Sequence, residues 1–169
     1  METMQAILTR NSTREYLEKI IPSSLIEKLL KAGMNAPSAN NLQPNHYVII
    51  NDKKALKNIS DLHPHGKMCK YAPVVILICA DTSKEKNIGY CIQDCSASCE
   101  NILIAANDIG LGGVWLGVYP REERMNQISS LLKRPKNIMP CMLIPIGFPK
   151  GKEKEKSNYS KEKIHYNFW

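Results

Sequence analysis

The feature that most constrains the fold of this chain is the segment PVVILIC at residues 73–79, an unbroken apolar run rich in β-branched side chains. A strand with one face in water alternates apolar and polar residues, whereas an unbroken apolar run is typical of a strand covered on both faces. The run therefore predicts the centre of a β-sheet that other elements cover from both sides.

Length and composition indicate one domain. The chain has 169 residues, of which 43% are hydrophobic, so we expect a single domain over residues 1–169. The opening METMQ lacks the basic and apolar segments of a secretory signal, and the longest apolar run, residues 72–80, is too short to span a membrane. We expect a cytoplasmic protein without membrane contact, whose six cysteines are reduced thiols.

Periodicity and turn residues predict the other elements. A capping box at Ser24 and Glu27 opens a helix that we expect Gly33 to end, and Pro145 indicates that the last strand lies at an edge or contains a bulge. The expected helices are residues 4–8, 24–33, 53–59, 88–109 and 122–132, and the expected strands are residues 47–50, 73–79, 111–118 and 142–147.

The longest expected helix carries a heptad-like seam of apolar or small residues. Such a seam packs either along the same helix of a second subunit or onto the core of its own chain, and the pattern leaves both open. Three cysteines four residues apart suit either soft metal ligation or packing, and packing is favoured for small buried cysteines. The seam residues are Ile88, Ile92, Cys95, Cys99, Ile102, Ala106 and Ile109, and the three cysteines are Cys91, Cys95 and Cys99.

Three segments are candidates for ligand binding. Residues 9–14 place a serine between two arginines four positions apart, which suits either a phosphate site or a solvated loop. Residues 36–44 are mostly turn formers and small side chains that suit either a flat ligand or a plain connection, and residues 112–117 contain glycines whose amides a ligand could approach. We find no catalytic triad, metal site or dinucleotide fingerprint in the sequence.

The net charge of +7 and the pI near 9.1 suit an anionic partner, either a nucleic acid or a phosphorylated small molecule. The basic segments lack interleaved aromatic residues and any known nucleic-acid recognition motif. A small phosphorylated ligand is therefore favoured, and we expect no nucleic acid partner.

Taken in order, these segments resemble the nitroreductase family along nearly the whole chain. Residues 9–16, TRNSTREY, look like the family's R-R-S-x-R-x-[FY] start, and residues 36–44, APSANNLQP, look like its A-P-S-x-x-N-x-Q-P loop. The match continues through residues 72–75, APVV, and through the long helix into residues 110–117, GLGGVWLG. It extends to the end of the chain at residues 162–169, EKIHYNFW.

The resemblance implies an α+β fold, a three-layer sandwich in which helices flank a mixed β-sheet, and a homodimer that forms through the long helix and exchanges its C-terminal tails. It also implies FMN as the cofactor, held at the subunit interface, and NADH or NADPH as the electron donor. The residues that it assigns to FMN are Arg10, Asn11, Ser12, Arg14, Pro37, Ser38, Ala39, Asn41, Lys67, Leu116, Gly117, Lys156 and Asn158.

By the family pattern these residues come from both subunits. Arg10, Ser12 and Arg14 of one subunit would reach the FMN phosphate, the ribityl chain and the pyrimidine edge. Residues 37–41 would come from the other subunit. Each site would thus be shared.

The pattern also assigns the rest of the FMN site. Lys67 would lie near the pyrimidine carbonyls, backbone amides of residues 116–118 would contact flavin N5 and O4, and Lys156 would approach the phosphate. Asn11 and Asn158 stand where the pattern usually has arginines, which predicts weaker phosphate binding.

The implied activity is that of an NAD(P)H-dependent flavin oxidoreductase which reduces nitroaromatic or quinone-type acceptors by a ping-pong mechanism. Such chemistry needs no catalytic side chain, because the flavin carries it, with the backbone of Gly117 near N5. Two alternatives stay open: another flavoprotein of the same fold, such as a dehalogenase or an azoline oxidase, and a flavin-binding protein without enzymatic activity.

Overall fold

The structure is a computed structural model that describes residues 2–151 and 157–169, and its five strands form one β-sheet. The strands are β1 (Asn45–Ile50), β2 (Val74–Asp81), β3 (Gly112–Gly113), β4 (Leu116–Gly117) and β5 (Ile138–Gly147). They lie in the order β1-β2-β5-β3, with β4 also paired to β5, and each of these pairs is antiparallel. The parallel component of the expected mixed sheet is the isolated bridge between Ser12 and Gly113.

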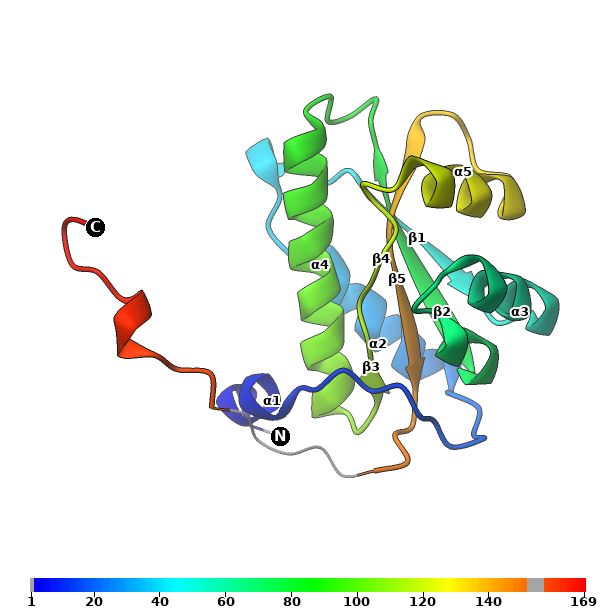
Figure 1. The fold of residues 1–169 in the computed structure, drawn as a ribbon, viewed down its shortest axis with the longest axis horizontal. Coiled ribbons are helices and arrows are strands. Elements are labelled where there is room, and N and C mark those ends of the chain that lie inside the picture. The colour runs from blue at the N-terminus through cyan, green and yellow to red at the C-terminus, as the bar shows by residue number, and fades with distance from the viewer. Residues whose placement is uncertain (1, 152–156) are drawn as a thin grey trace.

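Helices cover both faces of this sheet, as Figure 1 shows. The helices are α1 (Thr3–Thr9), α2 (Ser23–Met34), α3 (Lys53–Leu62), α4 (Ile88–Asp108) and α5 (Glu122–Leu131), with short 3₁₀ helices η1 (Ala39–Asn41), η2 (Lys67–Tyr71) and η3 (Lys161–Lys163). Helices α2 and α4 supply buried residues to the cluster on one face, and α3 and α5 to the cluster on the other. The expected three-layer sandwich is confirmed. Within the described residues, none of these helices has the length and apolarity that crossing a membrane requires.

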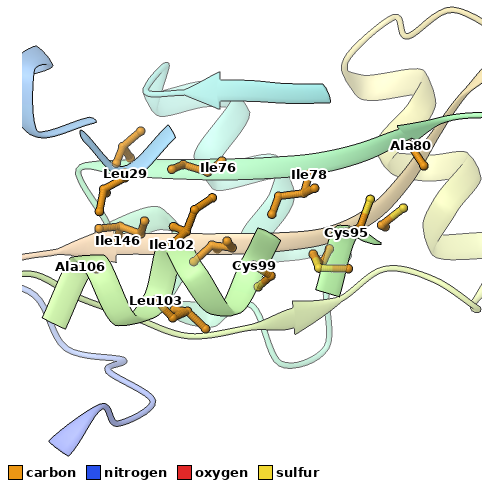
Figure 2. Packing of buried hydrophobic residues seen from close by; sticks show 14 of the residues in the cluster. Leu29, Ile76, Ile78, Ala80, Cys95, Cys99, Ile102, Leu103, Ala106 and Ile146 are labelled. Carbon is orange, nitrogen blue, oxygen red and sulfur yellow. The ribbon is translucent and has the colours of Figure 1, made fainter. Parts of the chain in front are cut away.

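The apolar run at residues 73–79 forms most of β2, which lies between β1 and β5 and is buried along its whole length. Its side chains alternate between the two buried clusters. Ile76 and Ile78 lie in the first cluster beside residues of α4 (Figure 2), whereas Val75 and Leu77 belong to the second. The prediction of a central strand covered on both faces is confirmed.

The seam of α4 packs onto the core of its own chain. Of the two interpretations of the seam, packing within the chain is therefore the one that the structure shows. The helix ends where the sequence predicts. Gly110 has a φ of 78°, which favours glycine, and the Leu111 N–H donates a hydrogen bond to the Ala106 carbonyl over 2.8 Å. The fully buried seam residues are Cys95, Cys99, Ile102 and Ala106.

All six cysteines are buried free thiols. Burial raises the pKa of Cys69 and Cys79 to about 12 and the pKa of Cys91 to about 11. Thiols with such pKa values stay protonated at neutral pH and are poor nucleophiles and metal ligands. The packing interpretation of Cys91, Cys95 and Cys99 agrees with their complete burial in the first cluster.

The second helix lies where the sequence predicts, to within one residue at each end, but the expected end signals are wrong. Pro22, rather than Ser24, is the N-cap of α2, and no side chain of the described residues caps it. Gly33 lies buried in the last turn, and α2 continues to Met34. A Cβ atom at Gly33 would lie 2.8 Å from the Ile102 Cδ1 atom of α4. The glycine is therefore explained by the close crossing of two helices, which sequence spacing alone does not reveal.

Pro145 lies in a central strand, which corrects the expectation of an edge. Its carbonyl accepts a hydrogen bond from the Val114 N–H on the side of β3 and β4, so its nitrogen faces that side as well. The ladder is interrupted there at Val114 and Trp115, and the missing N–H of proline therefore costs no strand pairing. The register shift between β2 and β5 lies elsewhere, at Ile78 and Cys79.

The C-terminal tail extends away from the body of the chain (Figure 1). Phe168 is 86% exposed and Trp169 is fully exposed. Within one chain, the aromatic end therefore does not dock onto the core.

Candidate functional site

A cleft of about 590 Å³ opens where the N-terminal loop, η2, β4 and the start of α5 meet. It brings together four residues that the resemblance assigned to FMN: Arg14, Lys67, Leu116 and Gly117. The residues that line it are Arg14, His63, His65, Lys67, Met68, Trp115, Leu116, Gly117, Tyr119, Pro120, Arg121 and Arg124.

The N-terminal loop is fixed to the sheet, which holds Arg14 at the cleft. The Thr13 N–H donates to the Gly113 carbonyl over 3.0 Å. The buried Tyr16 hydroxyl lies 2.7 Å from the Thr13 carbonyl and 3.0 Å from the Pro145 carbonyl. Burial raises the pKa of Tyr16, so the hydroxyl remains a donor. Arg14 lies between these two anchors.

The glycines of β3 allow close packing within the chain, which corrects the expectation that a ligand approaches their amides. Gly112 and Gly113 are both buried. A Cβ atom at Gly112 would lie 2.8 Å from the Thr13 Cβ atom, and one at Gly113 would lie 3.0 Å from the Pro145 carbonyl oxygen. Gly117 differs, because it is only half-buried and lines the cleft.

Two side chains hold the Gly117 carbonyl from the cleft side. His63 Nε2 lies 3.0 Å from this oxygen, and Arg124 Nη1 donates to it over 2.6 Å. The next amide, the Val118 N–H, donates to the Cys141 carbonyl of β5 over 3.0 Å and is therefore not available to a ligand. Because amides alternate in direction along an antiparallel strand, the Gly117 N–H points away from β5.

His63 is a residue of this cleft that the sequence analysis missed. The His65 N–H donates to His63 Nδ1 over 3.2 Å, so Nε2 carries the proton and donates to Gly117. The pKa of His63 lies below its usual value, mainly because the ring is buried and also because Arg124 is nearby. The only sequence signal for His63 is its position four residues before Lys67. Its contact with the Gly117 carbonyl could not be predicted, because the two residues are 54 positions apart.

The cleft is strongly basic. Four permanent cations line it, and no aspartate or glutamate of the described residues does. Such a lining favours an anionic ligand and raises its local concentration. The four cations are Arg14, Lys67, Arg121 and Arg124.

The other predicted residues of the N-terminal loop lie outside the cleft lining. Arg10 pairs with Glu100 of α4 at 3.2 Å. Asn11 Nδ2 donates to the Thr9 carbonyl over 2.8 Å, and the Ser12 side chain is exposed. Asn11 and Arg10 are thus engaged within the chain, while Ser12 faces solvent.

The second predicted segment, residues 37–41, lies beside the N-terminal half of α4 and contributes nothing to the cleft lining (Figure 1). Its backbone is unusual, because Asn40, Asn41 and Gln43 have φ values of 51°, 54° and 49°. Non-glycine residues in this region are strained, at about 1–3 kcal/mol each, and they concentrate at functional sites. The predicted FMN-binding residues Pro37, Ser38, Ala39 and Asn41 therefore lie apart from the cleft of their own chain.

Asp94 anchors this loop and was also missed by the sequence analysis. Its Oδ1 atom accepts a hydrogen bond from the Ala39 N–H over 3.0 Å. Ser38 Oγ accepts another from the Gln43 N–H over 3.0 Å. The second Asp94 oxygen, Oδ2, is buried and has no hydrogen-bond partner among the described residues. No motif marks Asp94, which the sequence shows only as one of several polar residues of the long helix.

Of the two predicted residues of the tail, only Asn158 belongs to the described residues, and it does not line the cleft. Lys156 lies outside the described residues. Asn158 is exposed in the extended tail.

Comparison with known proteins decides the family. Residues 7–65 and 63–148 match the model described as the nitroreductase family. This chain belongs to the nitroreductase family. A relative from Methanothermobacter thermautotrophicus, provisionally named an NADH dehydrogenase/NAD(P)H nitroreductase, is 40% identical over 100% of this chain and 88% of its own length.

Two solved structures extend the family match to the fold. One is from Parabacteroides distasonis, with the same provisional name, a TM-score of 0.96, 38% identity, and coverage of 100% of this chain and 99% of that one. The other is a provisionally named nitroreductase from Desulfovibrio desulfuricans in complex with FMN. Its TM-score is 0.85 and its identity 27%, over 100% of this chain and 98% of that one.

Proposed function

We propose that this nitroreductase-family chain is an NAD(P)H-dependent flavin oxidoreductase that binds FMN in the cleft beside β4. The observation that carries the proposal is the meeting of Arg14, Lys67 and Gly117 at one cleft. The acceptors would be nitroaromatics or quinones, reduced by a ping-pong mechanism in which donor and acceptor use the cleft in turn. The FMN bound to the Desulfovibrio desulfuricans relative supports the choice of cofactor.

The donor set at the cleft fits the edge of a flavin ring. Gly117 has no side chain to keep a ring away, and its N–H points away from the sheet. Arg14 and Lys67 place positive charge at the same cleft, where it would stabilise electrons that arrive on a bound ring. Bound FMN would supply the redox chemistry itself, by taking hydride from NAD(P)H and passing electrons to the acceptor.

We further propose a homodimer in which each FMN site is shared between subunits. Residues 37–41 lie apart from the cleft of their own chain, which fits a role at the cleft of a partner. Helix α1 exposes Met4, Ile7 and Leu8, an apolar face that a single chain leaves in water. The exposed aromatic tail would cover apolar surface of the partner. We place this enzyme in the cytoplasm.

The phosphate of FMN would lie outside the cleft, near Arg10 and Ser12. Arg10 already pairs with Glu100, so it would be shared between this carboxylate and the phosphate. Asn11 is bonded within the loop and contributes no charge. Lys156 and Asn158 of the tail complete the proposed phosphate site. With few cations at the phosphate, we expect FMN to bind more weakly than in a site with two further arginines.

The proposed site is tested by replacing Arg14 with alanine. Loss of one charge-assisted contact should weaken FMN binding about tenfold or more and slow flavin reduction by NAD(P)H. Flavin fluorescence titration measures the first, and anaerobic stopped-flow absorbance at the flavin bands measures the second. Lys28→Ala, on the exposed face of α2, is a control that removes one charge outside the cleft.

Unchanged FMN binding and unchanged reduction in Arg14→Ala would contradict the assignment of Arg14. The same spectra test the enzymatic activity. Purified protein should be yellow or become yellow with FMN, and NADH or NADPH should bleach it rapidly without oxygen. Bound flavin that neither nucleotide bleaches would instead indicate a flavin-binding protein without this activity.

A further inference from the structure

One cation of the cleft has no role in the FMN site proposed above. Arg14 and Lys67 are assigned to the flavin edge, and Arg124 is bonded to the Gly117 carbonyl. Arg121 remains. Its backbone N–H donates to the Val118 carbonyl over 3.1 Å, but its exposed guanidinium makes no hydrogen bond or ion pair with any described residue.

No carboxylate of the described residues neutralises this guanidinium inside the cleft. Glu122 and Glu123 follow Arg121 along the chain but are exposed and do not line the cleft. Glu123 instead accepts a hydrogen bond from Gln127 on α5. The Arg121 guanidinium is therefore available to bind a negatively charged ligand.

The aromatic lining beside Arg121 suits a ring. Trp115 is 38% exposed and lines the same cleft, as does Tyr119. Indole and phenol rings pack well against flat aromatic ligands, and arginine binds carboxylates with two parallel hydrogen bonds. Together these residues favour a ligand that has an aromatic ring and an anionic group at one end.

We infer that the electron acceptor of this enzyme is an anionic aromatic compound, such as a carboxylated nitroaromatic, whose carboxylate is bound by Arg121. The inference rests on the proposed flavin oxidoreductase function. In the balanced reaction, an aromatic nitro group takes a hydride equivalent from NAD(P)H and one H⁺ from the buffered solvent. It becomes a nitroso group and releases one water, while NAD(P)H is oxidised to NAD(P)⁺.

The test compares 4-nitrobenzoate with 4-nitrobenzamide, which have nearly the same shape and differ in charge. With the FMN-loaded enzyme, we expect kcat/KM for the benzoate to exceed that for the benzamide by about tenfold or more. Arg121→Gln should remove most of this preference by raising KM for the benzoate, and should leave the benzamide nearly unchanged. Lys28→Gln makes the same change of charge outside the cleft and should keep the preference.

Three results would overturn the inference. The first is a benzoate to benzamide ratio near or below one in the unmodified enzyme. The second is an equal loss of preference in Arg121→Gln and Lys28→Gln, because the effect would then come from overall charge. The third is slower flavin reduction by NAD(P)H in Arg121→Gln with an unchanged ratio, which would assign Arg121 to the donor.

Failure of the proposed function has a different signature. If NAD(P)H does not bleach the flavin, the oxidoreductase proposal itself fails. If NAD(P)H bleaches the flavin but neither nitro compound is turned over, the inference about the acceptor fails and the oxidoreductase proposal stands. Turnover of the neutral benzamide without any preference for the benzoate leaves the proposed function intact and rejects only the role of Arg121.

Discussion

His63 links the geometry of the cleft to pH at the scale of one residue. Its Nδ1 atom accepts the His65 N–H, and its Nε2–H donates to the Gly117 carbonyl. A proton added to Nδ1 would face the His65 N–H, and the first of these bonds would be lost. The Nε2–H that donates to Gly117 is present in both forms of the ring, so burial and the His65 N–H are what favour the neutral form.

This arrangement predicts a loss of stability in mild acid. Because burial lowers the pKa of His63 in the folded chain, the unfolded chain binds more protons as pH falls below about 6.5. The contribution of His63 to stability is full above that pH and is lost as pH falls toward the lowered pKa. His63→Gln keeps a donor for Gly117 but does not titrate, so its Tm should fall less between pH 7.5 and 5.5 than the Tm of the unmodified chain.

Differential scanning calorimetry at several pH values checks this prediction. Lys28→Gln, on the exposed face of α2, is a control that leaves every histidine in place and should keep the pH dependence of the unmodified chain. If His63→Gln and Lys28→Gln lose stability equally with falling pH, the buried histidine is not the group that titrates.

At the scale of elements, the short strand β3 decides where Arg14 lies. β3 pairs with β5, and its Gly113 carbonyl accepts a hydrogen bond from the Thr13 N–H of the N-terminal loop. This loop can approach closely because Gly112 has no side chain. The glycine therefore positions a loop of the proposed binding site without touching the ligand.

Gly112→Ala should displace the N-terminal loop, since the new Cβ atom would lie 2.8 Å from Thr13 Cβ. Overpacking of this kind typically costs about 1–3 kcal/mol of stability. We expect a lower Tm in thermal unfolding and weaker FMN binding in fluorescence titration. Gly151→Ala, where no atom of the described residues lies within 4 Å of the new Cβ, should change neither. A Gly112→Ala variant as stable as Gly151→Ala would show that the loop adjusts without cost.

At the scale of the whole molecule, one chain leaves much apolar surface in water. The tail ends in Phe168 and Trp169, both at least 86% exposed, and α1 exposes three large apolar side chains. Two aromatic side chains at the end of an extended segment are costly to leave in water when a partner can cover them. The proposed homodimer would bury them.

Replacing both Phe168 and Trp169 with alanine should weaken the dimer. Each large side chain buried at an interface contributes about 1.5–3 kcal/mol, so the dissociation constant should rise at least about tenfold. Sedimentation velocity over a range of concentrations measures this, and FMN retention should fall in parallel because the proposed site is shared. Circular dichroism should stay unchanged, since the tail does not pack on its own core. An unmodified chain that is monomeric at tens of micromolar would contradict the homodimer.

Local patterns in the sequence predicted the elements of this protein well. The apolar run of β2 and the seam of α4 are short-range periodicities, and both elements formed where they predict. The structure also brings Arg14, Lys67 and Gly117, which the family motifs single out, to one cleft, while their contact with FMN stays a prediction. Such features depend on neighbours within one or two turns, which the sequence itself displays.

Only the tertiary structure decided which distant residues meet. It seated the α4 seam on its own sheet, placed Gly33 at a helix crossing, and joined His63 to Gly117 across 54 positions. Asp94 and Ala39 meet across 55 positions in the same way. No local pattern records such pairs, because they depend on how whole elements pack and not on the residues beside them in the chain.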